Sequence, residues 1–178
     1  MRFEGPNGEL AFLLRPAGGA VEVRDGAGQT LAIFRLRQRG IDIEDIQGRA
    51  LARAVPPSQE RGFSVLDPTV GAPRVSLHRE PDGDIEVRDG DGARLYTLKK
   101  RSYGFKVLLA SGEVESRVRS GDRKVSIRDR EGVTLLSTRD PLPADAAAAL
   151  SLERVPFDWA AGLAIAMIHW RRPVEEAR

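Results

Sequence analysis

Four stretches of the 178-residue chain align with one another without gaps, and this repeat constrains the fold more than any other feature. They are VEVRDGAGQTL from Val21, IDIEDIQGRAL from Ile41, IEVRDGDGARL from Ile85 and VSIRDREGVTL from Val125. The starting positions differ by 20, 44 and 40 residues, which indicates a unit of about 20 residues and a small insertion between the second and third copies. A unit of this length fits a β-hairpin.

Each part of the shared pattern, apolar-x-apolar-x-Asp-x-x-Gly-x-x-Leu, has a structural role. The alternating apolar residues indicate a strand with one buried face. Asp first and Gly fourth predict a type I turn followed by a bulge, because Asp accepts hydrogen bonds from backbone amides and Gly tolerates a positive φ. On the returning strand, we expect four leucines to pack on the same face as the outgoing apolar pair: Leu31, Leu51, Leu95 and Leu135.

The same rhythm continues more weakly between these copies. Phe3 to Phe12, Phe63 to Leu77 and Phe105 to Val118 each surround a further turn. The sequence therefore predicts seven hairpins, or twelve to fourteen strands.

The chain changes character after Pro143. Residues 144–150 predict a short helix, and a core helix is expected over about 156–170. Only Asp158 and His169 interrupt the apolar or small residues from Phe157 to Trp170. Such a helix is about 21 Å long, too short for a hydrocarbon layer of about 30 Å, so we expect a buried core element and no integral membrane span.

A sheet with one apolar face and a helix apolar on all sides can cover each other if the sheet closes around the helix. We therefore predict a single, mainly β domain over residues 1–178. A closed antiparallel β-barrel occupies about 1–140 and surrounds the buried hydrophobic C-terminal helix.

Composition narrows the possible functions. The chain has no cysteine, which excludes disulfides, cysteine zinc sites, a thiol nucleophile and S-palmitoylation. Its 28 basic and 26 acidic residues nearly balance, so nucleic-acid binding is not expected unless positive charge is clustered. The N-terminus lacks the pattern of a secretion signal, which favours a cytoplasmic location, peripheral to a membrane if lipid is bound.

The ensemble of features resembles the tubby C-terminal-like superfamily, in particular its LURP-one-related and phospholipid-scramblase-like branch. The resemblance covers nearly the whole chain. It lies in the turn at Val87 to Gly92, in Leu98 to Arg101 leading into Phe105 to Val107, and in Val155 to Asp158 leading into the apolar helix. It implies a closed barrel of about twelve strands around the helix, and binding of phosphoinositides or other membrane lipids.

The scramblase motifs do not carry over to this chain. The cysteine-rich lipidation site is absent, and the stretch Asp140 to Pro156 has no closely alternating carboxylates. Calcium binding at that stretch and lipid scrambling are therefore not expected.

Two basic groups are candidates for binding a lipid phosphate or another polyanion. The denser group is Lys99, Lys100 and Arg101 with Lys106 on the following strand. The second, in the matching place of the first half, is Arg35, Arg37 and Arg39. A dense basic group at such a place is more often a solvated hairpin end than a binding site, and the second group can either extend the same surface or protect a sheet edge.

No catalytic, metal or cofactor site is predicted. The carboxylates from Asp82 to Asp91 lack a complete calcium loop, and the two histidines, His78 and His169, are far apart in the sequence. No serine elbow or phosphate-binding glycine loop occurs. The leading hypothesis is a non-enzymatic module that binds anionic lipid head groups or another polyanion at a membrane surface. The alternative is a protein-interaction or structural scaffold, such as a β-solenoid.

Overall fold

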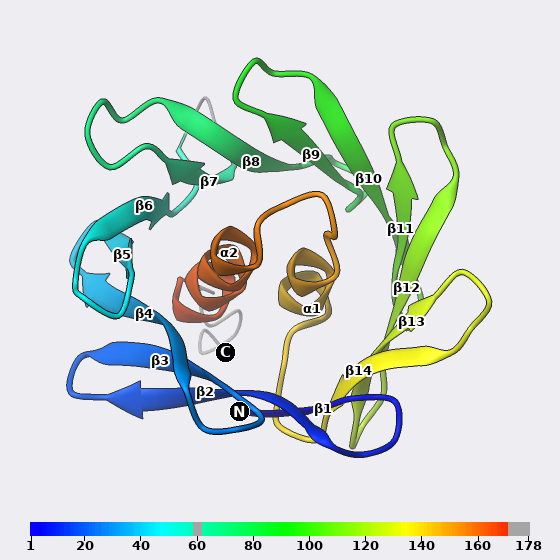
Figure 1. The fold of residues 1–178 in the computed structure, drawn as a ribbon. Helices are drawn as coiled ribbons and strands as arrows, with labels where there is room; N and C mark the ends of the chain where they lie inside the picture. The colour runs from blue at the N-terminus through cyan, green and yellow to red at the C-terminus, as the bar shows by residue number, and fades with distance from the viewer. Residues whose placement is uncertain (59–61, 171–178) are drawn as a thin grey trace, which may run out of the picture.

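Fourteen strands form one closed antiparallel barrel in the computed structural model, which describes residues 1–58 and 62–170. Each strand pairs with the next one along the chain, and β1 pairs with β14 to close the ring (Figure 1). The strands are β1 (Arg2–Glu4), β2 (Leu10–Ala17), β3 (Ala20–Asp25), β4 (Thr30–Arg37), β5 (Gly40–Glu44), β6 (Ala50–Val55), β7 (Phe63–Leu66), β8 (Pro73–Arg79), β9 (Ile85–Asp89), β10 (Arg94–Arg101), β11 (Gly104–Leu109), β12 (Val114–Ser120), β13 (Val125–Asp129) and β14 (Thr134–Thr138).

The closed antiparallel barrel is confirmed, but the number of about twelve strands implied by the resemblance is wrong. All seven hairpins contribute two strands each, including the weakly patterned pair β7 and β8. The first strand is only three residues long, yet it pairs on both sides and completes the ring.

The turns of the repeat have the predicted chemistry. Asp25 Oδ1 accepts hydrogen bonds from the amides of Ala27 and Gln29, both at 2.9 Å, and Asp45 and Asp89 act in the same way. Gly28 has a φ of 83°, and the glycines at the same position of the other repeat turns also have positive φ angles. These turns lie together at one end of the barrel, which we call the mouth.

The four repeat leucines pack less deeply than expected. In each of the seven hairpins the strand register shifts just after the turn at the mouth, so that one extra residue lies at the barrel lip. Leu31 and Leu51 take this bulge position and are 49% and 43% exposed, whereas Ala32 and Ala52, one residue later, are buried. The bulge residues are Ala11, Leu31, Leu51, Arg74, Leu95, Glu115 and Leu135.

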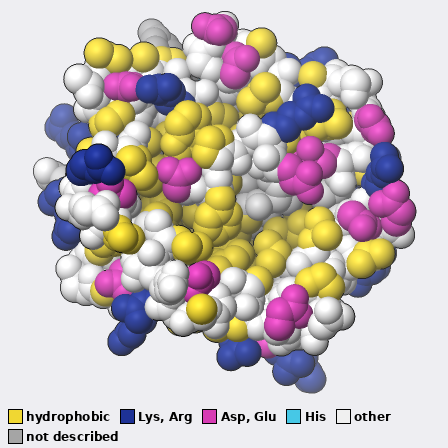
Figure 2. All heavy atoms as spheres, in the orientation of Figure 1, with side chains coloured by type: hydrophobic (Ala, Val, Ile, Leu, Met, Phe, Trp, Pro, Cys, Tyr) yellow, Lys and Arg dark blue, Asp and Glu magenta, His cyan; other side chains and the backbone are white. Residues whose placement is uncertain are grey.

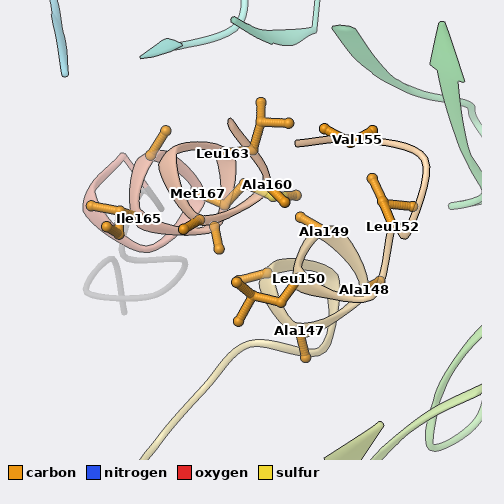
Figure 3. Packing of buried hydrophobic residues seen from close by; sticks show 14 of the residues in the cluster. Ala147, Ala148, Ala149, Leu150, Leu152, Val155, Ala160, Leu163, Ile165 and Met167 are labelled. Carbon is orange, nitrogen blue, oxygen red and sulfur yellow. The ribbon is translucent and has the colours of Figure 1, made fainter. Parts of the chain in front are cut away.

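Two helices lie within the ring of strands (Figure 1). Helix α1 (Ala144–Leu150) contacts β11 to β13, and α2 (Phe157–His169) contacts β5 to β7. The helices also contact each other, and Figure 3 shows Ala149 of α1 beside Ala160 of α2. Residues 160–167 of α2 are buried, whereas Phe157 and His169 at its ends are exposed.

Small residues allow this close packing. A Cβ atom added to Gly162 of α2 would lie 2.5 Å from Cδ1 of Ile43, which is fully buried on β5. Proline precedes each helix, at Pro143 and Pro156, where its fixed φ suits the start of a helix. Within residues 1–58 and 62–170, neither helix has the length and hydropathy needed to cross a bilayer.

Candidate anion-binding surface

The strand register aligns four basic side chains in one row across the outside of the barrel. Lys99 on β10 lies opposite Lys106 on β11, which lies opposite Arg117 on β12, which lies opposite Arg128 on β13. Their sequence neighbours Leu98, Val107, Val118 and Ile127 are buried in the core, so the basic residues occupy the outer face.

A second row of basic residues runs beside the first, farther from the mouth. Arg101 lies opposite Gly104, which lies opposite Arg119. The turn between β10 and β11 also presents Tyr103, whose side chain is 76% exposed. We call the following six residues the basic face: Lys99, Arg101, Lys106, Arg117, Arg119 and Arg128.

Acidic residues do not neutralise this face. Strands β10 to β13 contain eight basic residues and two acidic ones. One of the two, Glu115, accepts a 3.2 Å hydrogen bond from the hydroxyl of Tyr96, a side chain in the barrel core. The other, Asp129, accepts the Val133 amide in its turn. Among the described residues, neither of these two carboxylates forms a salt bridge with the basic face.

The arrangement is unfavourable for folding, because like charges on directly opposite strand positions repel. The Nε of Arg128 is also shielded from solvent, with no hydrogen-bond acceptor among the described residues. Arg117 directs its guanidinium to the carbonyl of Arg130, at 2.6 Å. An anion lying across the row would relieve the repulsion between these cations.

The corresponding row in the first half of the barrel has a different composition. Its members are Arg15, Glu22, Ile33 and Glu44, each 84 residues before its counterpart and paired in the same order. Strands β2 to β5 carry four basic and four acidic residues. Similar hairpins thus build a mixed surface on one side and a basic one on the other.

The second predicted group falls on this mixed surface. Arg35 donates two 3.1 Å hydrogen bonds to the carboxylate of Glu44, and these bonds raise the pKa of Arg35. The Nε of Arg37 lies 2.7 Å from Oδ2 of Asp42. Arg39 lies in the turn after β4, not on the strand face with the other two. Five strands separate β4 from β10, so the two predicted groups do not meet. The barrel is closed, and β4 has no free edge to protect.

The first predicted group is only partly on the basic face. Lys99, Arg101 and Lys106 belong to it, whereas Lys100 alternates toward the other side of the strand at the barrel rim. There the Lys100 amide donates to Asp84 at 2.7 Å, and its side chain lies across Gly83. Sequence reasoning missed Arg117, Arg119 and Arg128, although the alternation Arg-Val-Arg at 117–119 was a usable signal.

A second polar cluster lies at the mouth. The Tyr96 hydroxyl accepts a 2.8 Å hydrogen bond from the amide of Arg154, in the connection between α1 and α2, while it donates to Glu115. Burial raises the pKa of Tyr96 and that of the Glu115 carboxyl, whose Oε2 has no hydrogen-bond partner within the described part of the chain. This cluster ties the helix connection to the barrel wall.

The residues considered for metal binding have structural contacts. Asp82 and Asp84 accept backbone amides in and beside their turn, and Glu86 pairs with Arg88. His78 lies beside Ser76 at 3.0 Å, and His169 packs edge-on against Trp170. Among residues 1–58 and 62–170, no three potential ligands gather closely enough to hold a metal ion.

Comparison with known proteins gives little further guidance. No family model matches the sequence, and no curated protein matches it. Among solved structures, an alternansucrase in complex with isomaltononaose aligns with a TM-score of 0.20 and 12% sequence identity. The alignment covers 71% of this chain but only 12% of that one, so the chain spans a small part of the enzyme. A similarity this low carries no argument about fold or function.

Proposed function

We propose that the protein is a non-enzymatic module that binds anionic membrane surfaces through the basic face. The observation that carries the proposal is the row Lys99, Lys106, Arg117 and Arg128, which places one outward basic residue on each of four neighbouring strands, directly opposite the next. A row of this kind destabilises an isolated barrel and favours a surface of phosphate groups.

The exposed Tyr103 favours a membrane over a dissolved polyanion. Tyrosine is enriched at membrane interfaces because its ring is apolar and its hydroxyl is polar. Tyr103 lies at the tip of the hairpin that carries Lys99, Arg101 and Lys106, where it can enter the head-group layer as the cations contact phosphates. The resemblance to tubby-like proteins supports the same role, because it implies binding of membrane lipids. In this protein the two helices provide the hydrophobic interior of the barrel.

Flotation with phosphatidylcholine vesicles, with or without phosphatidylserine, tests the proposal. We expect binding only when the anionic lipid is present, and weaker binding as salt rises. Lys99→Glu should weaken binding by about 30-fold, because it removes one attraction and adds one repulsion. The matched control is Arg15→Glu, which makes the same charge change at the equivalent exposed position of β2 and should have little effect.

Three results would contradict the proposal. The first is absence of wild-type binding to the anionic vesicles. The second is equal loss of binding in the two variants, which would indicate a response to net charge alone. The third is tighter binding to RNA or duplex DNA than to vesicles at the same salt concentration, which would assign the basic face to nucleic acid.

A further inference from the structure

The mouth of the barrel is hollow and lined by apolar side chains (Figure 2). Of the seven large apolar residues that are highly exposed within residues 1–58 and 62–170, six lie at this end, in the turns, at bulge positions or at the start of α2: Leu31, Ile46, Leu51, Val70, Val133 and Phe157. An exposed apolar concentration around a hollow is typical of a ligand-binding site.

A cleft of about 530 Å³ opens between the β13–β14 hairpin and the connection from α1 to α2. Ile127, Leu135 and Leu136 line it from the wall. Leu152 and Val155 line it from the connection, and Phe157 lines it from the start of α2. Figure 3 shows Leu152 and Val155 on that connection, which passes from α1 to α2. Binding sites for small molecules commonly have volumes of about 300–1,000 Å³ and such apolar linings.

The two charged residues that line the cleft have opposite charges. Glu153 and Arg154 are adjacent, both are exposed, and both contribute to its lining. The hydrogen bond from the Arg154 amide to Tyr96 fixes this part of the connection to the wall. Because the two charges balance, this edge does not select a ligand with a net charge, but it can hydrogen-bond a polar head group.

We propose that this cleft binds a single acyl chain whose head group has no net charge. The chain replaces water on the leucine and isoleucine side chains, and the head group lies at Glu153 and Arg154. Monoacylglycerols and lysophosphatidylcholines share this chemistry. The site is separate from the basic face, and Lys99→Glu should leave it unchanged.

Isothermal titration calorimetry of the whole protein tests the inference. Monolauroylglycerol and lauroyl-lysophosphatidylcholine, below their micelle concentrations, serve as the two probes, and the tighter one identifies the head group. Glycerol and glycerophosphocholine, which carry the head groups without the chain, should give no binding. Absence of binding by both lauroyl compounds would overturn the inference, whatever the result with anionic vesicles.

The chain offers a matched pair of variants. Leu135 and Leu51 occupy equivalent bulge positions 84 residues apart, but only Leu135 lines the cleft. Leu135→Gln should weaken lauroyl binding by about tenfold or more, and Leu51→Gln by less than about twofold. An equal effect of both would overturn the inference.

A second measurement needs no variant. A nitroxide label on the acyl chain should broaden the methyl NMR signals of Leu135 and Leu136 in the wild-type protein and spare those of Leu51. Equal broadening of the Leu51 methyl signals would contradict binding of the acyl chain in this cleft.

Discussion

Replacing Tyr96 with phenylalanine should destabilise the protein by about 2 kcal/mol. The change removes one hydroxyl, which accepts the Arg154 amide at 2.8 Å and donates to Glu115 at 3.2 Å. A neutral hydrogen bond contributes about 0.5–1.5 kcal/mol, and one to a charged group about 1.5–3 kcal/mol. Together the two bonds would contribute about 2–4.5 kcal/mol. The bond to Glu115 is long and Glu115 is half-buried, so we expect a loss near the lower end of this combined range.

Urea unfolding followed by circular dichroism measures this change. In thermal unfolding of a chain of this size, the same loss of about 2 kcal/mol should lower the melting temperature by about 4–8 °C. Tyr103→Phe is the control, because Tyr103 is 76% exposed and its hydroxyl makes no hydrogen bond among the described residues. A Tyr96→Phe variant within about 0.5 kcal/mol of wild type would refute the view that this hydroxyl holds the helix connection to the wall.

Two further changes test the barrel interior. Burial raises the pKa of Glu115, so the folded protein holds that proton more tightly than the unfolded chain, and stability should fall as pH rises through the raised pKa. Glu115→Gln should flatten this part of the stability curve in urea titrations at several pH values, and an unchanged slope would contradict the assignment. Gly162→Ala should destabilise by about 1–3 kcal/mol in thermal unfolding, because its Cβ would lie 2.5 Å from Ile43. Adding Ile43→Val should recover part of the loss, and no recovery would place the clash elsewhere.

Local patterns made the hairpins predictable. The Asp and Gly of each repeat act within their own turn, so the sequence contains the information that forms it. The leucines were harder, because the bulge adds one residue before the strand resumes. Leu31 lies at the lip as a result, and Ala32 takes the core position.

The candidate sites depend on information that is not local. Lys99 and Arg117 approach each other only through β11, and Arg35 differs from them because Glu44 follows on the neighbouring strand. Turn lengths fix these registers, so extending the hairpin geometry across four strands would have revealed the basic row. The cleft was beyond such reasoning, since it joins β13 and β14 to the connection before α2.

The ring is a meander with a single contact between its extremes, the pairing of β1 with β14. Every other strand can add to the one made just before it, so the wall can assemble in the order of synthesis without long searches through conformational space. The seam is brief, with Glu4 opposite Ser137, compared with six pairs between β2 and β3. Thermal fluctuations should therefore separate β1 from β14 before any other pair of strands, which would open a route by which α1 and α2 enter the barrel.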